Sequence, residues 1–152
     1  MKKLLSECIR AGRVMNAVAA GTTDQNGTGV DLSADGGYDG VLFIGVFGAL
    51  TATQVTQLHA EVSDDDGSSD GYSDLADSQT DALGDDDDND LVLLDVFQPP
   101  KKWVRPVVER GTANAVIDGV IALLYRGRAP ITSHLGTVAV TGTAVQKAEG
   151  TI

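Results

Sequence analysis

The feature that most limits the fold of this chain is a regular alternation of short apolar runs with segments rich in Gly, Asp and Ser. Residues 41–47 and 91–97 are apolar runs of strand length, and residues 56–62 alternate polar with apolar side chains, as a strand with one exposed face does. With 18 glycines and few aromatic residues, the composition favours short elements joined by turns over long packed helices. Such a pattern is typical of a β-sandwich or barrel.

We therefore predict an all-β fold, an antiparallel β-sandwich or jelly-roll-like domain of about eight strands. The dipeptide Asn26-Gly27 predicts a hairpin, because both residues tolerate a positive φ. Residues 41–47 predict a central strand that is buried on both faces. Pro106 lacks the N–H that a central strand donates, so residues 103–108 are expected at a sheet edge or at a bulge.

Two further segments complete the expected strand count. Residues 115–125 fit a helix by their length, but their Val and Ile residues and the central Gly119 favour a strand. Residues 137–145 alternate valine with small residues and are expected to form the last strand.

The length of 152 residues fits one domain. Residues 1–13 combine apolar side chains at helix-like spacing with basic ones, and either a short helix or an extended arm fits them. Their basic residues are Lys2, Lys3, Arg10 and Arg13. We expect an N-terminal arm at 1–13 that reaches a neighbouring subunit, followed by a single β domain at 14–152. The only cysteine, Cys8, leaves no partner for an intrachain disulfide.

Charge is segregated along the chain, which has a net charge of −11. Residues 14–100 contain no Lys or Arg but hold 18 of the 22 acidic residues. Such an acidic surface repels a phosphate backbone, so we expect no nucleic-acid partner. The longest apolar run, residues 41–50, is about half of what a membrane helix requires, so we expect no membrane partner either. The segregation indicates complementary patches between copies or partners, unless the chain ends fold back and neutralise the acidic segment.

Catalytic motifs are missing from the sequence. Only His59 and His134 could act as bases near neutral pH, and neither lies in a nucleophile, phosphate-binding or metalloprotease motif. His59 falls on the polar face of the strand expected at 56–62, and His134 falls in an expected loop, so both are interpreted as solvated side chains. We therefore expect a protein that is not an enzyme.

One weak metal motif appears in the acidic segment. Read at alternate positions, it matches part of a calcium-binding loop. The candidate ligands are Asp66, Ser68, Asp70, Asp74 and Asp77. The last position holds Asp where a bidentate Glu is usual, and the flanking segments resemble strands rather than helices. The same residue types also build ordinary turns, so we commit to no cofactor and keep Ca²⁺ binding as an alternative.

One basic segment beside an aromatic residue predicts a protein contact, because Trp and Arg are enriched at the centres of interfaces. It consists of Lys101, Lys102, Trp103 and Arg105. An inward-pointing Trp103 at the centre of the core is the competing interpretation. The apolar residues at 41–47 and 115–125 also exceed what one thin sandwich must cover, which predicts a homo-oligomer.

Three groups of residues together resemble a known family. They are residues 19–24 (AAGTTD), the segment 59–68 (HAEVSDDDGS) leading to 72–75 (YSDL), and 103–108 (WVRPVV) running into 117–122 (IDGVIA). This combination is similar to small capsid cement or decoration proteins of tailed bacteriophages, which are encoded beside the major capsid protein. The resemblance covers roughly residues 15–130 and includes no catalytic signature.

The resemblance implies a structural virion protein, made in the host cytoplasm and placed on the outside of the capsid. There it would bind the major capsid protein and copies of itself, as a homodimer or homotrimer, and stabilise contacts between capsid subunits. The alternative from another class is a calcium-dependent module of a virion or cell surface that binds a carbohydrate or a receptor through the loop at 66–77.

Overall fold

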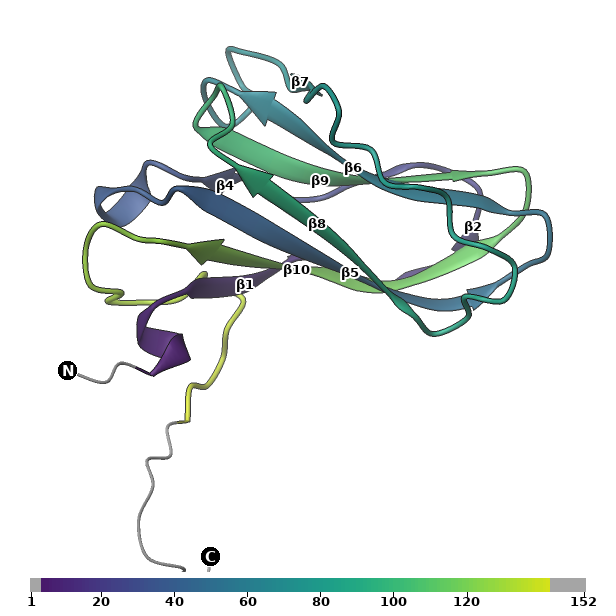
Figure 1. Cartoon of the computed structure of the whole chain (residues 1–152). Helices are drawn as coiled ribbons and strands as arrows, with labels where there is room; N and C mark the ends of the chain where they lie inside the picture. Colours follow the sequence, from purple (N-terminus) through teal and green to yellow (C-terminus); the bar gives the residue numbers. More distant parts are fainter. Residues whose placement is uncertain (1–3, 143–152) are drawn as a thin grey trace, which may run out of the picture.

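Two antiparallel five-stranded sheets pack face to face in the computed structural model, which describes residues 4–142 (Figure 1). The first sheet contains β1 (Arg10–Met15), β2 (Val18–Gly21), β5 (Gly40–Leu50), β8 (Leu91–Phe97) and β10 (Ala115–Tyr125). The second contains β3 (Gln25–Asn26), β4 (Val30–Asp31), β6 (Val55–Ser63), β7 (Ser73–Asp74) and β9 (Trp103–Gly111). Two short 3₁₀ helices complete the fold: η1 (Leu5–Glu7) precedes β1, and η2 (Ala34–Gly36) precedes β5. The predicted all-β sandwich is confirmed.

The first sheet has the order β1-β10-β5-β8, with β2 following β1 along the same edge of β10. The second has the order β3-β9-β6-β7, with β4 beside β9. Each sheet therefore has an edge strand that is broken into two short pieces. These pieces explain why the described residues form ten strands where about eight were expected.

The core lies between the sheets and is built from alternate residues of the long strands. Its largest fully buried apolar side chains are Phe43, Phe47, Leu58, Ile117, Leu124, Val41, Val104, Val108 and Val120. On β5 only one face is part of this core, since the residues between the buried ones are half-buried. The expectation that 41–47 is buried on both faces is therefore wrong, because no described element covers the outer face of β5.

Pro106 lies in the middle of the second sheet, which corrects the prediction of an edge strand. On one side β9 pairs with β6, where Ala60 is opposite Pro106. On the other side the ladder is interrupted between β3 and β4, and there the Pro106 carbonyl accepts a hydrogen bond from Gly27 N at 2.8 Å. The gap removes the need for a proline N–H. Asn26-Gly27 therefore lies beside β9, and the predicted hairpin does not form.

Gly119 creates a β-bulge in β10. The register with β5 shifts between Ile117 and Gly119, and Gly119 has a φ of 141°, a value that L side chains rarely adopt. A Cβ at this position would lie 2.9 Å from the carbonyl oxygen of Met15. The segment is a strand, as predicted, and the bulge explains its central glycine.

The expected N-terminal arm is wrong for residues 10–13, which belong to β1. Arg10 forms an ion pair with Asp35 of the same chain at 3.1 Å, and Arg13 is exposed on the sheet. Ala11 and Gly12, which lie between them, pair with Leu123 and Ala122 of β10, so the first sheet begins before residue 14. Lys2 and Lys3 lie outside the described residues.

The expected strand at 137–145 does not form over 137–142, and 143–145 lie outside the described residues. Residues 134–137 instead follow the free edge of β1. Leu135 N donates to the Ala11 carbonyl at 3.0 Å, and Arg13 N donates to Thr137 Oγ1 at 2.8 Å. One of these two hydrogen bonds uses the side chain of Thr137, so residues 134–137 cover the edge of β1 without forming a regular β-ladder.

Candidate interaction surface

The outer face of the first sheet carries aligned apolar side chains. The strand register places Ile121, Ile44 and Leu93 in one row across β10, β5 and β8. Leu91 and Leu93 on β8 are 59% and 60% exposed, and Phe97 is 49% exposed. We call this surface the apolar face and define it by Leu42, Ile44, Val46, Leu91, Leu93, Phe97, Ile121 and Leu123. Neighbouring exposed apolar side chains on a protein surface are typical of an interaction site.

The rim of the apolar face is polar at one end. Tyr125 reaches across Gly40, and its hydroxyl donates a hydrogen bond to Asp95 Oδ1 at 2.6 Å. Burial of the Tyr125 hydroxyl, followed by its hydrogen bond to Asp95, raises the pKa of Tyr125 to about 12. Arg126 lies over the ring of Phe97, 5.5 Å from its centroid. Polar groups around an apolar centre are the usual anatomy of a protein interface.

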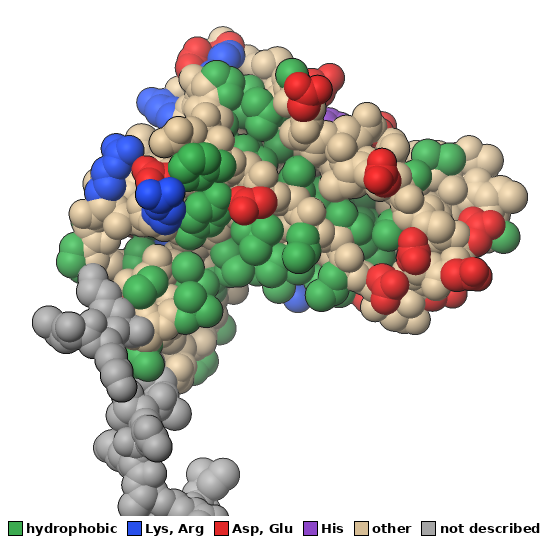
Figure 2. Space-filling model, viewed as in Figure 1, with side chains coloured by type: hydrophobic (Ala, Val, Ile, Leu, Met, Phe, Trp, Pro, Cys, Tyr) green, Lys and Arg blue, Asp and Glu red, His purple; other side chains and the backbone are tan. Residues whose placement is uncertain are grey.

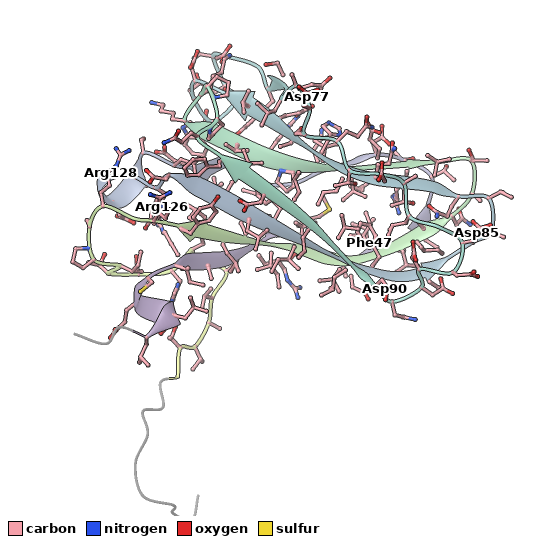
Figure 3. All side chains as sticks on the ribbon, viewed as in Figure 1. Phe47, Asp77, Asp85, Asp90, Arg126 and Arg128 are labelled. Carbon is pink, nitrogen blue, oxygen red and sulfur yellow. The ribbon has the colours of Figure 1, made fainter. Side chains whose placement is uncertain are left out.

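Opposite charges lie at the two ends of the apolar face. Arg126 and Arg128 follow β10 at one end, and their side chains are 65% and 70% exposed. The aspartates of 85–90 precede β8 at the other end; Figure 3 labels Asp85 and Asp90 there. In Figure 2 hydrophobic side chains gather around β8, with Lys and Arg at one end of the molecule and a group of Asp and Glu at the opposite end.

The aspartates at 85–90 also have a structural role. Asp88 accepts a hydrogen bond from Leu50 N, and Asp85 accepts one from Thr53 N, at the turn between β5 and β6. Within residues 4–142, no aspartate of the segment 81–90 forms an ion pair with Lys or Arg. This end of the molecule is therefore acidic and not neutralised by the described chain.

Some of the other acidic side chains are paired with basic ones within the chain. Lys101 Nζ lies 2.6 Å from Asp70 and 3.7 Å from Asp64, while Arg126 and Arg128 both contact Asp39. At the end of the molecule that contains Lys101, basic residues from the C-terminal part of the chain pair with acidic ones, as the second interpretation of the charge pattern expected. At the end that contains 85–90, the acidic residues stay separate from the basic ones.

Two residues of the basic segment predicted to contact a partner are engaged inside their own chain, as Arg10 is. Lys101 binds Asp70, and Arg105 binds Glu61 through Nε and stacks on Tyr72, 4.3 Å from the ring centroid. Lys102 is exposed and Trp103 is half-buried. Lys102 also lines a hollow of about 400 Å³ at this end of the sandwich, and its other lining residues include Pro99, Pro100 and Arg128. The role of these residues in binding stays a prediction.

The five candidate calcium ligands do not come together. Asp70 Oδ2 accepts hydrogen bonds from Lys101 Nζ and from Asp64 N, and these two interactions, the Lys101 one first, lower the pKa of Asp70. Asp66 accepts a hydrogen bond from Ser68 N at 3.2 Å, within the same turn. Asp74 and Asp77 instead line a different pocket together with His59. In the described part of the chain, the carboxylates of Asp66 and Asp70 are therefore bound by backbone N–H groups and by Lys101.

His59 is buried, which corrects the expectation of a solvated side chain. Only 8% of the residue is exposed, because the irregular segment 75–83 follows the free edge of β6. Leu75 N and Thr80 N donate to carbonyls of β6 at 2.9 Å. This segment has no strand-like pattern, so the sequence contains no clear signal that it covers His59.

Comparisons with known proteins give no match: no protein family, no curated protein and no solved structure is detectably similar to this chain. Among residues 4–142, no helix has the length and apolar character needed to cross a membrane. The candidate interaction surface therefore rests on its geometry and chemistry alone.

Proposed function

We propose that this protein is a non-catalytic structural subunit that pairs with a second copy through the apolar face and attaches, as a dimer, to the outside of a phage capsid. There it stabilises contacts between major capsid subunits. The apolar face is the observation that carries the self-association part of this proposal. The capsid part rests on the resemblance of the sequence to capsid cement proteins.

The row formed by Ile44, Leu93 and Ile121 supports self-association. Each of these side chains points away from the core of its own domain, and the strand at the sheet edge, β8, contributes alternate exposed leucines. Burying an exposed leucine at an interface contributes roughly 1.5–3 kcal/mol. Several such residues in register therefore favour association of two such faces.

The charge pattern supports a second copy as the occupant of the face. A twofold axis perpendicular to the strands would place the acidic end of one copy, at 85–90, beside Arg126 and Arg128 of the other. The face is thus complementary to itself in charge as well as in apolar character. A parallel arrangement would bring the two acidic ends together and is disfavoured by repulsion.

Attachment to the capsid is assigned to the end that contains the 400 Å³ hollow. Lys102 lines the hollow and is exposed, and Trp103 keeps part of its surface exposed at the same end. Lys102 directly precedes β9 of the second sheet and does not belong to the apolar face. We do not pursue the calcium-dependent alternative, because the carboxylates it needs lie at two separate places.

Co-sedimentation with empty phage heads that lack the protein tests the attachment. The wild-type chain is expected to sediment with the heads, and Lys102→Glu is expected to reduce binding at least about tenfold, because it places a negative charge at the proposed contact. Val55→Glu is the matched control, because it adds a negative charge at an exposed position at the opposite end of the second sheet, and it should bind normally. Equal binding of Lys102→Glu and the control would contradict the assigned attachment surface, and failure of the wild type to bind would contradict the capsid role.

A further inference from the structure

We propose that His59, Glu61 and Asp74 form a binding site for a divalent transition-metal ion of the zinc type. The site lies on the second sheet, so it is independent of the apolar face and of the proposed function. It also differs from the calcium loop considered above, with which it shares only Asp74.

Strand pairing brings the three side chains together. His59 and Glu61 are alternate residues of β6 and share its outer face, and β7 places Asp74 directly opposite Glu61. One ligand atom from each of the three lies within 4.8 Å of the others. His59 Nε2 lies 3.5 Å from Asp74 Oδ1. Two ligands bound to one Zn²⁺ at about 2.1 Å in a tetrahedron are about 3.4 Å apart, so this pair already has the required spacing.

The imidazole of His59 points to a ligand because it is buried without a hydrogen bond. Its side chain is 10% exposed, and Nδ1 has no hydrogen-bond partner. A buried polar group that lacks a hydrogen bond costs free energy. A metal ion on Nε2 would fix the ring proton on Nδ1, on the side of Glu109, and so give Nδ1 a partner.

Glu109 provides the group that usually supports a metal-binding histidine. Its Oε1 lies 3.4 Å from His59 Nδ1, on the side of the ring opposite Asp74. Gln79 Nε2 donates to Glu109 Oε2 at 2.7 Å and holds the carboxylate in place. With an ion on Nε2, the proton of the ring belongs on Nδ1, facing Glu109. This carboxylate–histidine–metal order is the common one in zinc sites.

The ligand types select the class of ion. One imidazole with carboxylates suits Zn²⁺ and related transition metals, whereas Ca²⁺ prefers oxygen ligands alone. Asp74 is 83% exposed, and a pocket of about 160 Å³ beside His59 gives an ion and a water ligand access to the site. Glu61 already binds Arg105, which makes it the weakest of the three ligands.

Binding would fasten β7 to β6. The β7 strand has two residues and pairs with β6 only at Glu61 and Val62. An ion shared by His59 and Asp74 adds a link at the point where the acidic turn at 64–70 rejoins the sheet. The expected role is therefore structural, with the ion limiting the movement of this turn.

The test is a zinc titration of the full chain after treatment with a chelator, read by competition with a chromogenic chelator. We expect one ion per chain and an upward shift of the melting temperature with added Zn²⁺. Asp74→Asn should weaken binding at least about tenfold and abolish the shift, and Glu109→Gln should weaken binding about 10- to 100-fold. Asp66→Asn is the matched control, an exposed aspartate outside the cluster, and should behave as the wild type.

His59→Asn tests the central ligand but changes a buried residue, so its folding must first be checked by circular dichroism. Asp74 is exposed, and its variant therefore keeps the proposal testable if the histidine variant does not fold. Absence of saturable zinc binding would overturn the proposal. Equal loss of affinity in Asp74→Asn and Asp66→Asn would also overturn it, because it would show general attraction of cations to an acidic surface.

Discussion

The outer faces of the two sheets differ in character although both sheets have the same architecture. On the second sheet, the register places Glu61 opposite Arg105 and Gln57 opposite Glu109, and the chain at 75–83 covers the adjoining edge. On the first sheet, the corresponding positions hold Ile44 and Leu93, with no described segment over them.

This difference indicates which surface needs a partner. Around His59, charged pairs and hydrogen bonds link the polar side chains on the outer face of the second sheet within one chain. Exposed leucine and isoleucine side chains cannot form ion pairs or hydrogen bonds within the chain. Burial against a partner molecule would remove them from water.

Neighbouring leucines on β8 should differ most in their contribution to stability. Leu94 points into the core and Leu93 away from it. We expect Leu94→Ala to lower the free energy of unfolding by about 2–4 kcal/mol, because it leaves a cavity. Leu93→Ala should cost under about 1 kcal/mol in dilute solution, as an exposed substitution does. Urea denaturation measures both, and equal losses would contradict the assignment of inner and outer faces.

The bulge that sets the register of β10 should require glycine. Gly119→Ala is expected to cost about 1–3 kcal/mol, because it adds a Cβ 2.9 Å from the Met15 carbonyl at a φ of 141°. Gly111→Ala is the matched control, since a Cβ there has no neighbour within 4 Å. Thermal melts compare the two. A Gly119→Ala variant as stable as Gly111→Ala would show that the bulge is not needed.

The charged pair on the second sheet should contribute less than the core. Arg105→Met is expected to cost about 1 kcal/mol, because it removes the interaction with Glu61 while keeping an apolar stem beside Tyr72. Lys102→Met, an exposed change next to the same strand, should leave stability unchanged. Chemical denaturation at low and high salt provides the measurement. The opposite ranking would mean that the outer face of this sheet is not held by its charge pairs.

Acid should loosen the turn at 64–70 before the sandwich unfolds. The pKa of Asp70 is lowered in the folded chain, first by the hydrogen bond from Lys101, so its contribution is present above the ordinary carboxyl pKa of about 4 and is lost as the pH falls through the lowered value. The N–H of Asp64 donates to Asp70 at 2.7 Å, so the protection factor of this amide, its exchange compared with the intrinsic rate at the same pH, should fall at low pH. Asp70→Asn should remove this pH dependence. An unchanged acid response in that variant would assign the effect to another group.

The strands with clear ends could be predicted from the sequence. The predicted ranges 91–97 and 115–125 match β8 and β10, because turn residues or prolines flank the first and β-branched residues fill the second. The surplus of apolar residues at 41–47 and 115–125 predicted exposed apolar side chains, and association through them stays a prediction. The exposure of Leu91 and Leu93 could not be read from an uninterrupted apolar run.

Contacts made by irregular segments were not predictable. Burial of His59 depends on residues 75–83, and the central position of Pro106 depends on the gap between β3 and β4. Arg110 shows the same limit. It is 6% exposed and donates to the carbonyls of Thr23, Ala19 and Ala115, partners that are mostly distant in sequence. No local pattern distinguishes it from a surface arginine.

Sedimentation velocity over a range of concentrations tests the pairing through the apolar face most directly. If the apolar face pairs, the wild-type chain reaches twice the 15.7 kDa of one copy, Leu93→Lys stays at one copy, and Val55→Lys associates like the wild type. Val55 is the matched control because it is 44% exposed on the other sheet. A wild type that remains at 15.7 kDa at every concentration, or a Leu93→Lys variant that still pairs, would rule out pairing through this face.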